Sequence, residues 1–189
     1  FKSCWVVFKS FTLVYVIMVY IGRVAGVGLT ARGNPVLLYA LSGRSASSRE
    51  RVAVIHKGKV AIEPCGGMTP EQAEKAQRLI YDAIRVSDFF GFGVVSNGKQ
   101  TGDIFGTYKR RELLEYLPFY RGLNDRYIIS EVLTKWGHEG MVGDKYNTPR
   151  IAGIADLDQL HIGIVTASAF RERSTASVSP KPGEMHYLS

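Results

Sequence analysis

The sequence has few of the residues from which metal centres and disulfide frameworks are built. Its 189 residues include two cysteines, Cys4 and Cys65, and four histidines scattered along the chain. The cysteines match neither the spacing of a metal site nor a disulfide framework, and the histidines add no zinc-ligand pattern. These shortages argue against a zinc site and favour a reducing compartment. We therefore expect a cytoplasmic protein with no metal.

Long apolar runs are also scarce. An almost unbroken apolar run extends from Phe11 to Ile21, which is shorter than the ~18–20 residues that a membrane-spanning helix needs. Lys2 and Lys9 precede it as in a signal peptide, but no convincing small-residue cleavage site follows. We interpret residues 1–17 as an upstream extension outside the fold, with a signal or anchor segment as the alternative. Residues 18–189 are then one domain, and we expect no membrane partner.

Acidic residues are outnumbered by basic ones, 17 against 24, which gives a formal net charge of +7. Such an excess suits an anionic partner, which could be a nucleotide, a nucleic acid or a membrane surface. A solvated basic surface explains the charge equally well. Hydrophobic residues make up 46% of the chain and charged residues 22%, as in ordinary folded proteins with a core.

The pattern of apolar residues and turn signals predicts a strand-rich chain with helices in its middle. Strands are expected at residues 19–29, 35–41, 52–55, 59–62, 80–86, 92–96, 150–155 and 160–166, and at 185–188 at the end of a polar tail. Helices are expected at residues 69–79, 101–116 and 124–136. Strand-rich blocks around helices indicate an α+β fold with mostly antiparallel pairing.

Three stretches contain candidate ligand-binding side chains, and the first is Ser42–Arg49. It offers Arg44, Ser45 and Arg49. Guanidinium forks and a hydroxyl are the residue types that bind phosphate oxygens, since a fork can engage two oxygens at once. A plain exposed loop with no ligand is the alternative interpretation.

The second stretch, Ser96–Thr101, contains Asn97 and Gly98. Asn-Gly is a strong signal for a type I′ hairpin turn, which is the simplest interpretation. A side-chain amide beside a tight backbone could instead read a carboxamide group. Tyr81 stands one expected strand earlier, and it is either a core residue with a satisfied hydroxyl or part of the same site.

The third stretch surrounds Pro149. This proline disfavours a helical conformation of Thr148 and pushes it into an extended one, and a buried strand is expected to follow. Asn147, Thr148 and Arg150 therefore gather at the entrance of a strand, where they offer several hydrogen-bonding groups. A strand cap beside a surface arginine is the alternative.

In this order and spacing, the three stretches resemble the archaeal-type IMP cyclohydrolases and their bacterial relatives. Met18–Arg23 matches the start of these proteins, and Asn97–Ile104 matches the bacterial pattern Asn-Gly-x-Gln-Thr-x-x-Ile. The resemblance implies a four-layer αββα sandwich like that of the N-terminal-nucleophile hydrolases. Their autocatalytic chemistry is not implied, because residue 18 is methionine. Family members continue past Ser189, which implies a missing C-terminal segment.

The resemblance also implies a reaction, the closure of 5-formamidoimidazole-4-carboxamide ribonucleotide to inosine monophosphate (IMP) with loss of water. This is the last step of IMP synthesis, and no cofactor is implied. The expected partner is this purine-precursor ribonucleotide and not a nucleic acid, and homo-oligomerisation is left open. Tyr81 and Glu139 are implied as catalytic residues, with Asp144 the competitor for Glu139 because the loop there is longer than in the family. The implied substrate-binding residues are Arg44, Ser45, Arg49, Asn97, Gly98, Asn147, Thr148 and Arg150.

Two functions from other classes compete with this one. A basic nucleic-acid-binding module is suggested by Lys109–Arg111 together with Tyr108, Tyr116 and Tyr120, which offer charge and stacking surfaces. The charge is dispersed, however, and the chain has no glycine-aromatic RNA-binding signature. An amidase of the same fold is disfavoured because the N-terminal nucleophile is missing.

Overall fold

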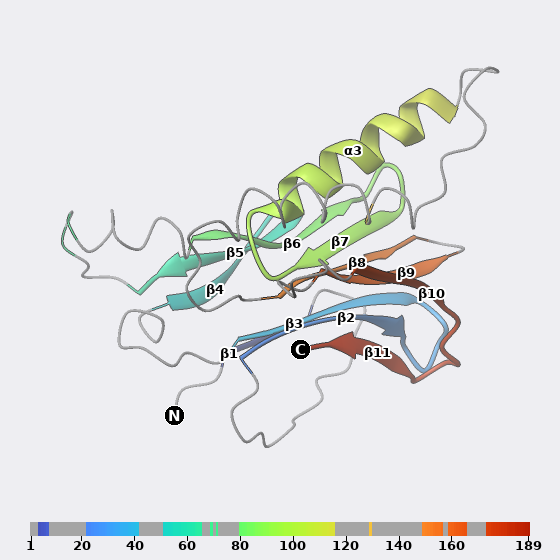
Figure 1. The fold of residues 1–189 in the computed structure, drawn as a ribbon, viewed down its shortest axis with the longest axis horizontal. Helices are drawn as coiled ribbons and strands as arrows, with labels where there is room; N and C mark the ends of the chain where they lie inside the picture. The colour runs from blue at the N-terminus through green and yellow to red at the C-terminus, as the bar shows by residue number, and fades with distance from the viewer. Residues whose placement is uncertain are drawn as a thin grey trace.

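Two β-sheets lie face to face in the computed structural model, and a helix covers the outer face of the larger sheet (Figure 1). The structure describes residues 4–7, 22–41, 51–65, 69, 71, 80–115, 129, 149–156, 159–165 and 173–189. Within these residues, each strand pairs antiparallel with its neighbours. The expected α+β class with mostly antiparallel pairing is confirmed.

The smaller sheet has four strands in the order β1-β3-β2-β11. They are β1 (Cys4–Val7), β2 (Arg23–Leu29), β3 (Pro35–Leu41) and β11 (Met185–Leu188). The expected tight reversal between β2 and β3 is confirmed. Gly33 has a φ of 80° there, which glycine adopts without strain, and Asn34 N donates to Thr30 Oγ1 at 3.0 Å.

Strand β1 lies in the segment 1–17, which we expected to lie outside the fold. It pairs with β3, from Cys4 opposite Leu41 to Val7 opposite Leu38. The expectation is therefore wrong for this strand. The unpaired edge of β3 offers backbone donors and acceptors, and the β-branched and aromatic residues of β1 favour an extended conformation. The boundary of one domain over residues 18–189 stays a prediction.

The larger sheet has seven strands in the order β10-β9-β8-β7-β6-β5-β4. They are β4 (Arg51–His56), β5 (Lys59–Pro64), β6 (Tyr81–Ser87), β7 (Phe92–Ser96), β8 (Arg150–Ala155), β9 (Leu160–Val165) and β10 (Arg173–Val178). The strands follow one another in sequence order, and helix α3 (Gln100–Glu115) is inserted between β7 and β8. The hairpins expected at β4–β5 and β6–β7 are confirmed.

Strand β10 was not expected, because its sequence reads as part of a polar tail. It pairs with β9 along its whole length, from Arg173 opposite Val165 to Val178 opposite Leu160. It is the edge strand of the sheet, and the side chains of Ser174, Ala176 and Ser177 are exposed. Pairing with one neighbour is enough to hold this strand, so its sequence lacks the apolar alternation that signals a half-buried one.

The central strands of the larger sheet are buried on both faces, as β7 shows. Alternate residues of a strand point to opposite faces, so Val95 packs in the core between the two sheets while Phe92 and Val94 pack towards α3. Ile104 and Tyr108 of α3 complete this second cluster. The molecule thus has one core between the sheets and another beneath the helix, and both meet at β7 and β8.

Helix α3 confirms the helix expected at residues 101–116. The two other expected helices lie outside the described residues, apart from the isolated positions Thr69, Glu71 and Ile129. A second helical layer over the smaller sheet is therefore not described. In the described part of the chain, no helix has both the length and the apolar character needed to cross a membrane.

Candidate active site

Described residues within or beside the three stretches singled out in the sequence meet at one end of the stacked sheets. Residues 42–49 join the end of β3 to Arg51, the first residue of β4. Asn97 directly follows β7, and Pro149 directly precedes β8, which is the neighbour of β7 in the sheet. Side-chain contacts described below connect these points through Tyr81. The second stretch, the described part of the third and Arg51, which lies two residues after the first, therefore surround one place in the fold.

Tyr81, the first residue of β6, is the centre of the candidate site. Its hydroxyl is hydrogen-bonded to that of Tyr39 on the other sheet, and the two rings meet edge to face with centroids 6.4 Å apart. Arg51 makes a side-chain hydrogen bond to Tyr81. The guanidinium carbon of Arg23 lies 5.6 Å from the centroid of the Tyr81 ring, a cation–π distance. Three side chains from three strands thus hold this phenol.

Burial sets the protonation of the groups around Tyr81. The pKa of Tyr39 is raised well above its ordinary value because burial penalises the phenolate, and Tyr81 beside it adds to this. Burial also lowers the pKa of the Arg51 guanidinium, and the positive charge of Arg23 acts in the same direction. Tyr39 is therefore protonated at neutral pH, with a proton that it can donate.

Asn97 connects the end of β7 to the beginning of β8. Its Nδ2 donates to Pro149 O at 2.7 Å, and its Oδ1 accepts from Ile151 N at 3.1 Å and from Gln100 Nε2 at 2.8 Å. Its backbone oxygen accepts from Arg23 Nη1 at 2.9 Å. The side chain is buried and fixes the backbone on both sides of Arg150. Asn97 thus links the second and third stretches.

Gly98 leaves room for two side chains of the site. A Cβ at this position would lie 2.4 Å from Gln100 Oε1 and 3.4 Å from Arg150 Nη1. The carbonyl oxygen of Gly98 accepts hydrogen bonds from Thr101 Oγ1 at 2.9 Å and from Ser96 Oγ at 3.1 Å. These bonds join the end of β7 to the first turn of α3. A side chain here would push the end of the Gln100 side chain away from its place beside Asn97.

The type I′ hairpin turn that Asn-Gly suggests does not form. Asn97 and Gly98 connect β7 to helix α3, and Gly98 is not among the described glycines with positive φ. Side-chain bonds from Asn97 to the neighbouring strand take the place of the hairpin. The alternative interpretation of this stretch is therefore wrong, whereas the alternative for Tyr81, a core tyrosine with a satisfied hydroxyl, agrees with its burial.

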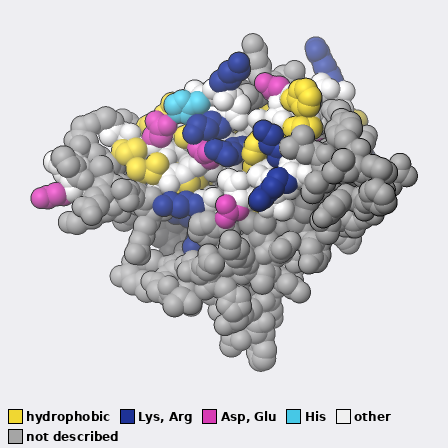
Figure 2. Space-filling view, turned by 90° about the horizontal axis from the view of Figure 1, so that it is seen from above, with side chains coloured by type: hydrophobic (Ala, Val, Ile, Leu, Met, Phe, Trp, Pro, Cys, Tyr) yellow, Lys and Arg dark blue, Asp and Glu magenta, His cyan; other side chains and the backbone are white. Residues whose placement is uncertain are grey.

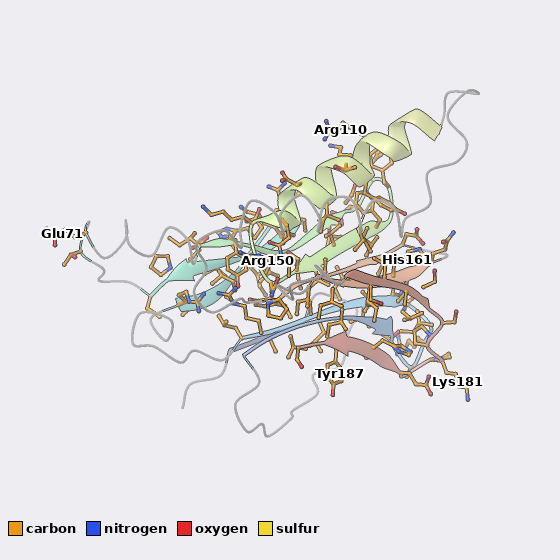
Figure 3. All side chains as sticks on the ribbon, viewed as in Figure 1. Glu71, Arg110, Arg150, His161, Lys181 and Tyr187 are labelled. Atoms are coloured by element: carbon orange, nitrogen blue, oxygen red, sulfur yellow. The ribbon has the colours of Figure 1, made fainter. Side chains whose placement is uncertain are left out.

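Several predicted site residues lie outside the described residues. They are Arg44, Ser45, Arg49, Glu139, Asn147 and Thr148, as is the competitor Asp144. Tyr81, Asn97, Gly98 and Arg150 are described, and the contacts above bring them together. Figure 3 shows Arg150 in the middle of the molecule, whereas Arg110 and Lys181 lie at its periphery.

Three members of the site were not predicted as site residues from the sequence: Arg23, Tyr39 and Arg51. Arg23 and Tyr39 lie on strands of the smaller sheet, and their contacts with Asn97 and Tyr81 cross between the sheets. Arg23 ends the Met18–Arg23 stretch, which served only to mark the start of the resemblance. Tyr39 and Arg51 have no local signal that separates them from ordinary strand residues.

In the described part of the chain, neither metal-binding groups nor surface charge point to a second site. Among the described residues, no group of three or more His, Cys, Asp or Glu side chains is placed to hold a metal ion. On the face seen in Figure 2, Lys and Arg side chains have Asp and Glu side chains among them. Among the described residues of that face, this mixture of signs differs from the uniformly basic surface that favours nucleic-acid binding.

Comparison with known proteins agrees with this arrangement. The family described as IMP cyclohydrolase-like protein matches residues 20–189. An IMP cyclohydrolase of Methanococcus maripaludis is 32% identical over 171 residues, which are 90% of this chain and 73% of the relative. The IMP cyclohydrolase of Methanocaldococcus jannaschii is 32% identical over 169 residues, 89% of this chain and 71% of the relative. The protein belongs to the IMP cyclohydrolase-like family.

Proposed function

We propose that the protein is an IMP cyclohydrolase, which closes the ring of 5-formamidoimidazole-4-carboxamide ribonucleotide to give IMP and water. This is the activity that names its archaeal relatives. The observation that supports it best is the contact network around Tyr81 and Arg23, which links Arg51, two residues after the first stretch, with Asn97 of the second stretch and Pro149 of the third. The reaction changes no oxidation state, so it needs no redox cofactor.

The reaction depends more on how the carboxamide and formyl groups of the substrate are positioned than on chemical activation of either group. The carboxamide nitrogen attacks the formyl carbon, and the carbinolamine that forms then loses its hydroxyl and the proton of the former formamide nitrogen as water. An amide nitrogen is a poor nucleophile, so holding the two groups in a near-attack geometry can supply much of the acceleration. Hydrogen bonds to the formyl oxygen and proton transfer to the departing hydroxyl supply the rest.

Tyr81 is the proposed proton donor, and Glu139 is the proposed acceptor of the proton that the carboxamide nitrogen loses. The proton that the carboxamide nitrogen loses ends on the formyl oxygen, which thereby becomes the hydroxyl. A phenol can polarise this oxygen during the attack and then protonate the hydroxyl that leaves. Tyr81 suits this task because Tyr39 and Arg51 hold its oxygen. Asp144 is the competitor for the acceptor role. Turnover measured for Glu139→Gln and Asp144→Asn separates the two, since the variant at the true acceptor is the slower one.

The phosphate is proposed to bind Arg44, Ser45 and Arg49, with Arg150 as the next contact. Asn147 is proposed to orient the carboxamide and formyl groups, and Thr148 to bind the substrate beside it. The support for this is that residues 42–49 are followed closely by Arg51, whose side chain is hydrogen-bonded to Tyr81. A dianionic phosphate requires charge-assisted hydrogen bonds, which guanidinium groups supply. Gly98 leaves room for Gln100 and Arg150 beside it, and Asn97 acts by holding the backbone around Arg150.

The finer fold and setting are also proposals. The two stacked antiparallel sheets with α3 on one outer face (Figure 1) support a four-layer αββα sandwich of the N-terminal-nucleophile-hydrolase type. A purine-precursor ribonucleotide is the proposed partner and the cytoplasm the proposed location. A nucleic-acid-binding module is not favoured, because the relatives are named as enzymes and charges of both signs mix on the face in Figure 2.

The experiment that tests the function is direct. The purified protein is incubated with the formamido ribonucleotide, and the ultraviolet absorbance of the inosine base is followed, with and without a metal chelator. We expect catalysed ring closure in both samples. Closure no faster than in buffer, with a protein that melts cooperatively, would overturn the function. Loss of activity in chelator that zinc restores would overturn only the metal-free mechanism.

A further inference from the structure

The two hydroxyls of Tyr39 and Tyr81 form a buried pair that joins the two sheets. Tyr39 is on β3 of the smaller sheet and Tyr81 on β6 of the larger one, and their side chains are hydrogen-bonded oxygen to oxygen. Only 3% of the surface of Tyr39 and 6% of that of Tyr81 is exposed. Water therefore has little access to the pair, and protein groups decide where the two protons point.

The neighbours of Tyr81 limit those directions. Arg51 can only donate hydrogen bonds, so its bond to Tyr81 uses an acceptor position of the Tyr81 oxygen. Arg23 places a positive charge over the ring of the same residue. Both cations stabilise negative charge on the Tyr81 oxygen. They thus prepare the site for a moment at which Tyr81 has given up its proton.

We infer that Tyr39 is a positioning residue that donates its hydrogen bond to the Tyr81 oxygen while Tyr81 delivers its proton to the departing hydroxyl. The inference rests on the proposed cyclohydrolase function. In this step the Tyr81 O–H bond breaks, the carbon–oxygen bond of the carbinolamine breaks, and water forms. The proton of the former formamide nitrogen is released as the carbon–nitrogen double bond forms, and it restores the Tyr81 hydroxyl.

The donor direction follows from what each tyrosine can do in that step. Tyr81 directs its only proton to the substrate, so it cannot also donate to Tyr39. Tyr39 then remains the donor of the pair, and burial keeps it protonated. A donor fixed in advance and aimed at developing charge needs no reorganisation during the reaction, which is the condition for effective electrostatic stabilisation. The opposite direction, Tyr81 donating to Tyr39, would withhold the catalytic proton.

The test compares Tyr39→Phe, Tyr81→Phe and the double variant, with Tyr108→Phe as the matched control. Tyr108 is a buried tyrosine whose hydroxyl donates to Asp156 Oδ2 at 2.6 Å, and it belongs to the other core cluster. We expect Tyr39→Phe to lower kcat about tenfold, as for the loss of one hydrogen bond, with KM nearly unchanged. The double variant should be no slower than Tyr81→Phe, and Tyr108→Phe should turn over normally.

Several results would contradict the inference. An unchanged or raised kcat in Tyr39→Phe would mean that Tyr39 accepts the bond or plays no part. If Tyr39→Phe lowers the kcat of the Tyr81→Phe variant by the same factor by which it lowers the kcat of the wild type, then Tyr39 acts independently of Tyr81, through the fold. Denaturant midpoints of the four proteins give a readout apart from activity. Non-additive changes in these midpoints confirm that the two tyrosines are coupled, even if the wild type shows no turnover. Absence of turnover would overturn the function and, with it, the positioning role of Tyr39.

Discussion

Two hydrogen bonds join Asn97, just after the end of β7, to Ile151, near the beginning of β8. Asn97 N donates to Ile151 O at 3.2 Å, and Ile151 N donates to the side-chain oxygen of Asn97 at 3.1 Å. The same side chain reaches Pro149 and Gln100. One asparagine therefore fixes the backbone that presents Arg150 and the first turn of α3.

Replacing Asn97 by alanine should lower the free energy of unfolding by about 2–4 kcal/mol, since each buried group left without a partner costs ~1–3 kcal/mol. The groups affected are Ile151 N, Pro149 O and Gln100 Nε2. Denaturant unfolding measures the change. Asn34→Ala, at an exposed turn position, is the control and should be nearly neutral. Equal effects of the two substitutions would show that the bonds of Asn97 contribute nothing special.

The glycines at the beginning of α3 should respond to alanine in opposite directions. At Gly98 a Cβ would lie 2.4 Å from Gln100 Oε1, so Gly98→Ala should displace Gln100 from Asn97 and cost about 1–3 kcal/mol of stability. At Gly102 nothing lies within 4 Å of the added atom, and alanine in a helix should gain about 0.5–1 kcal/mol. Thermal unfolding of both variants checks the signs. Stabilisation by Gly98→Ala would contradict the described packing.

The elements that the sequence predicted are those with strong local patterns. Strands β2 to β9 and helix α3 follow apolar periodicity and turn residues, and they are found within a few residues of the expected bounds. Strands β1 and β10 were missed because their pairing with an edge strand decides their structure. Local patterns record which side chains a strand buries, and an edge strand such as β10, with exposed side chains at Ser174, Ala176 and Ser177, leaves almost no such record.

The candidate site was predicted only where a motif was contiguous. Asn97, Gly98 and Arg150 lie in short stretches whose residue types suggested binding. Tyr39 meets Tyr81 across 42 residues of sequence, and Arg23 meets Asn97 across 74, so no window of the sequence contains either pair. The function of Asn97 also depends on its partners. Its hydrogen bonds to the neighbouring strand could not be read from an Asn-Gly dipeptide.

Stability at alkaline pH should report the burial of Tyr39. Its pKa is raised in the folded protein, so the folded state keeps a proton that the unfolded chain releases near its ordinary pKa of about 10. The contribution of Tyr39 is therefore fully present below about pH 10 and is lost as pH rises towards the raised pKa. The Tyr39→Phe variant has no hydroxyl at this position, so its stability lacks this dependence on pH. The stability difference between wild type and variant should shrink above pH 10, and a constant difference would contradict the burial of a protonated Tyr39.

Recognition of the 5′-phosphate should depend on Arg44. Arg44→Ala should weaken binding of the ribonucleotide roughly 10–100-fold, the cost of a lost charge-assisted hydrogen bond, and should leave binding of the unphosphorylated riboside nearly unchanged. Titration calorimetry with both ligands measures this. Arg32→Ala, at an exposed position in the β2–β3 turn, is the control and should bind both as the wild type does. If Arg44→Ala weakens the binding of both ligands equally, then Arg44 contacts the imidazole base of the ligand or acts through the stability of the fold.

The central claim is that this protein closes the purine ring at Tyr81, and steady-state ring closure by wild type and Tyr81→Phe tests it most directly. Tyr187→Phe, at a tyrosine that is 60% exposed, is the matched control. We expect the wild type and Tyr187→Phe to convert the formamido ribonucleotide to IMP at equal rates. Turnover by Tyr81→Phe should fall roughly 10²–10⁴-fold, as expected for a lost general acid, with substrate binding little changed. A wild type no faster than buffer, or a Tyr81→Phe variant as fast as the wild type, would contradict the account.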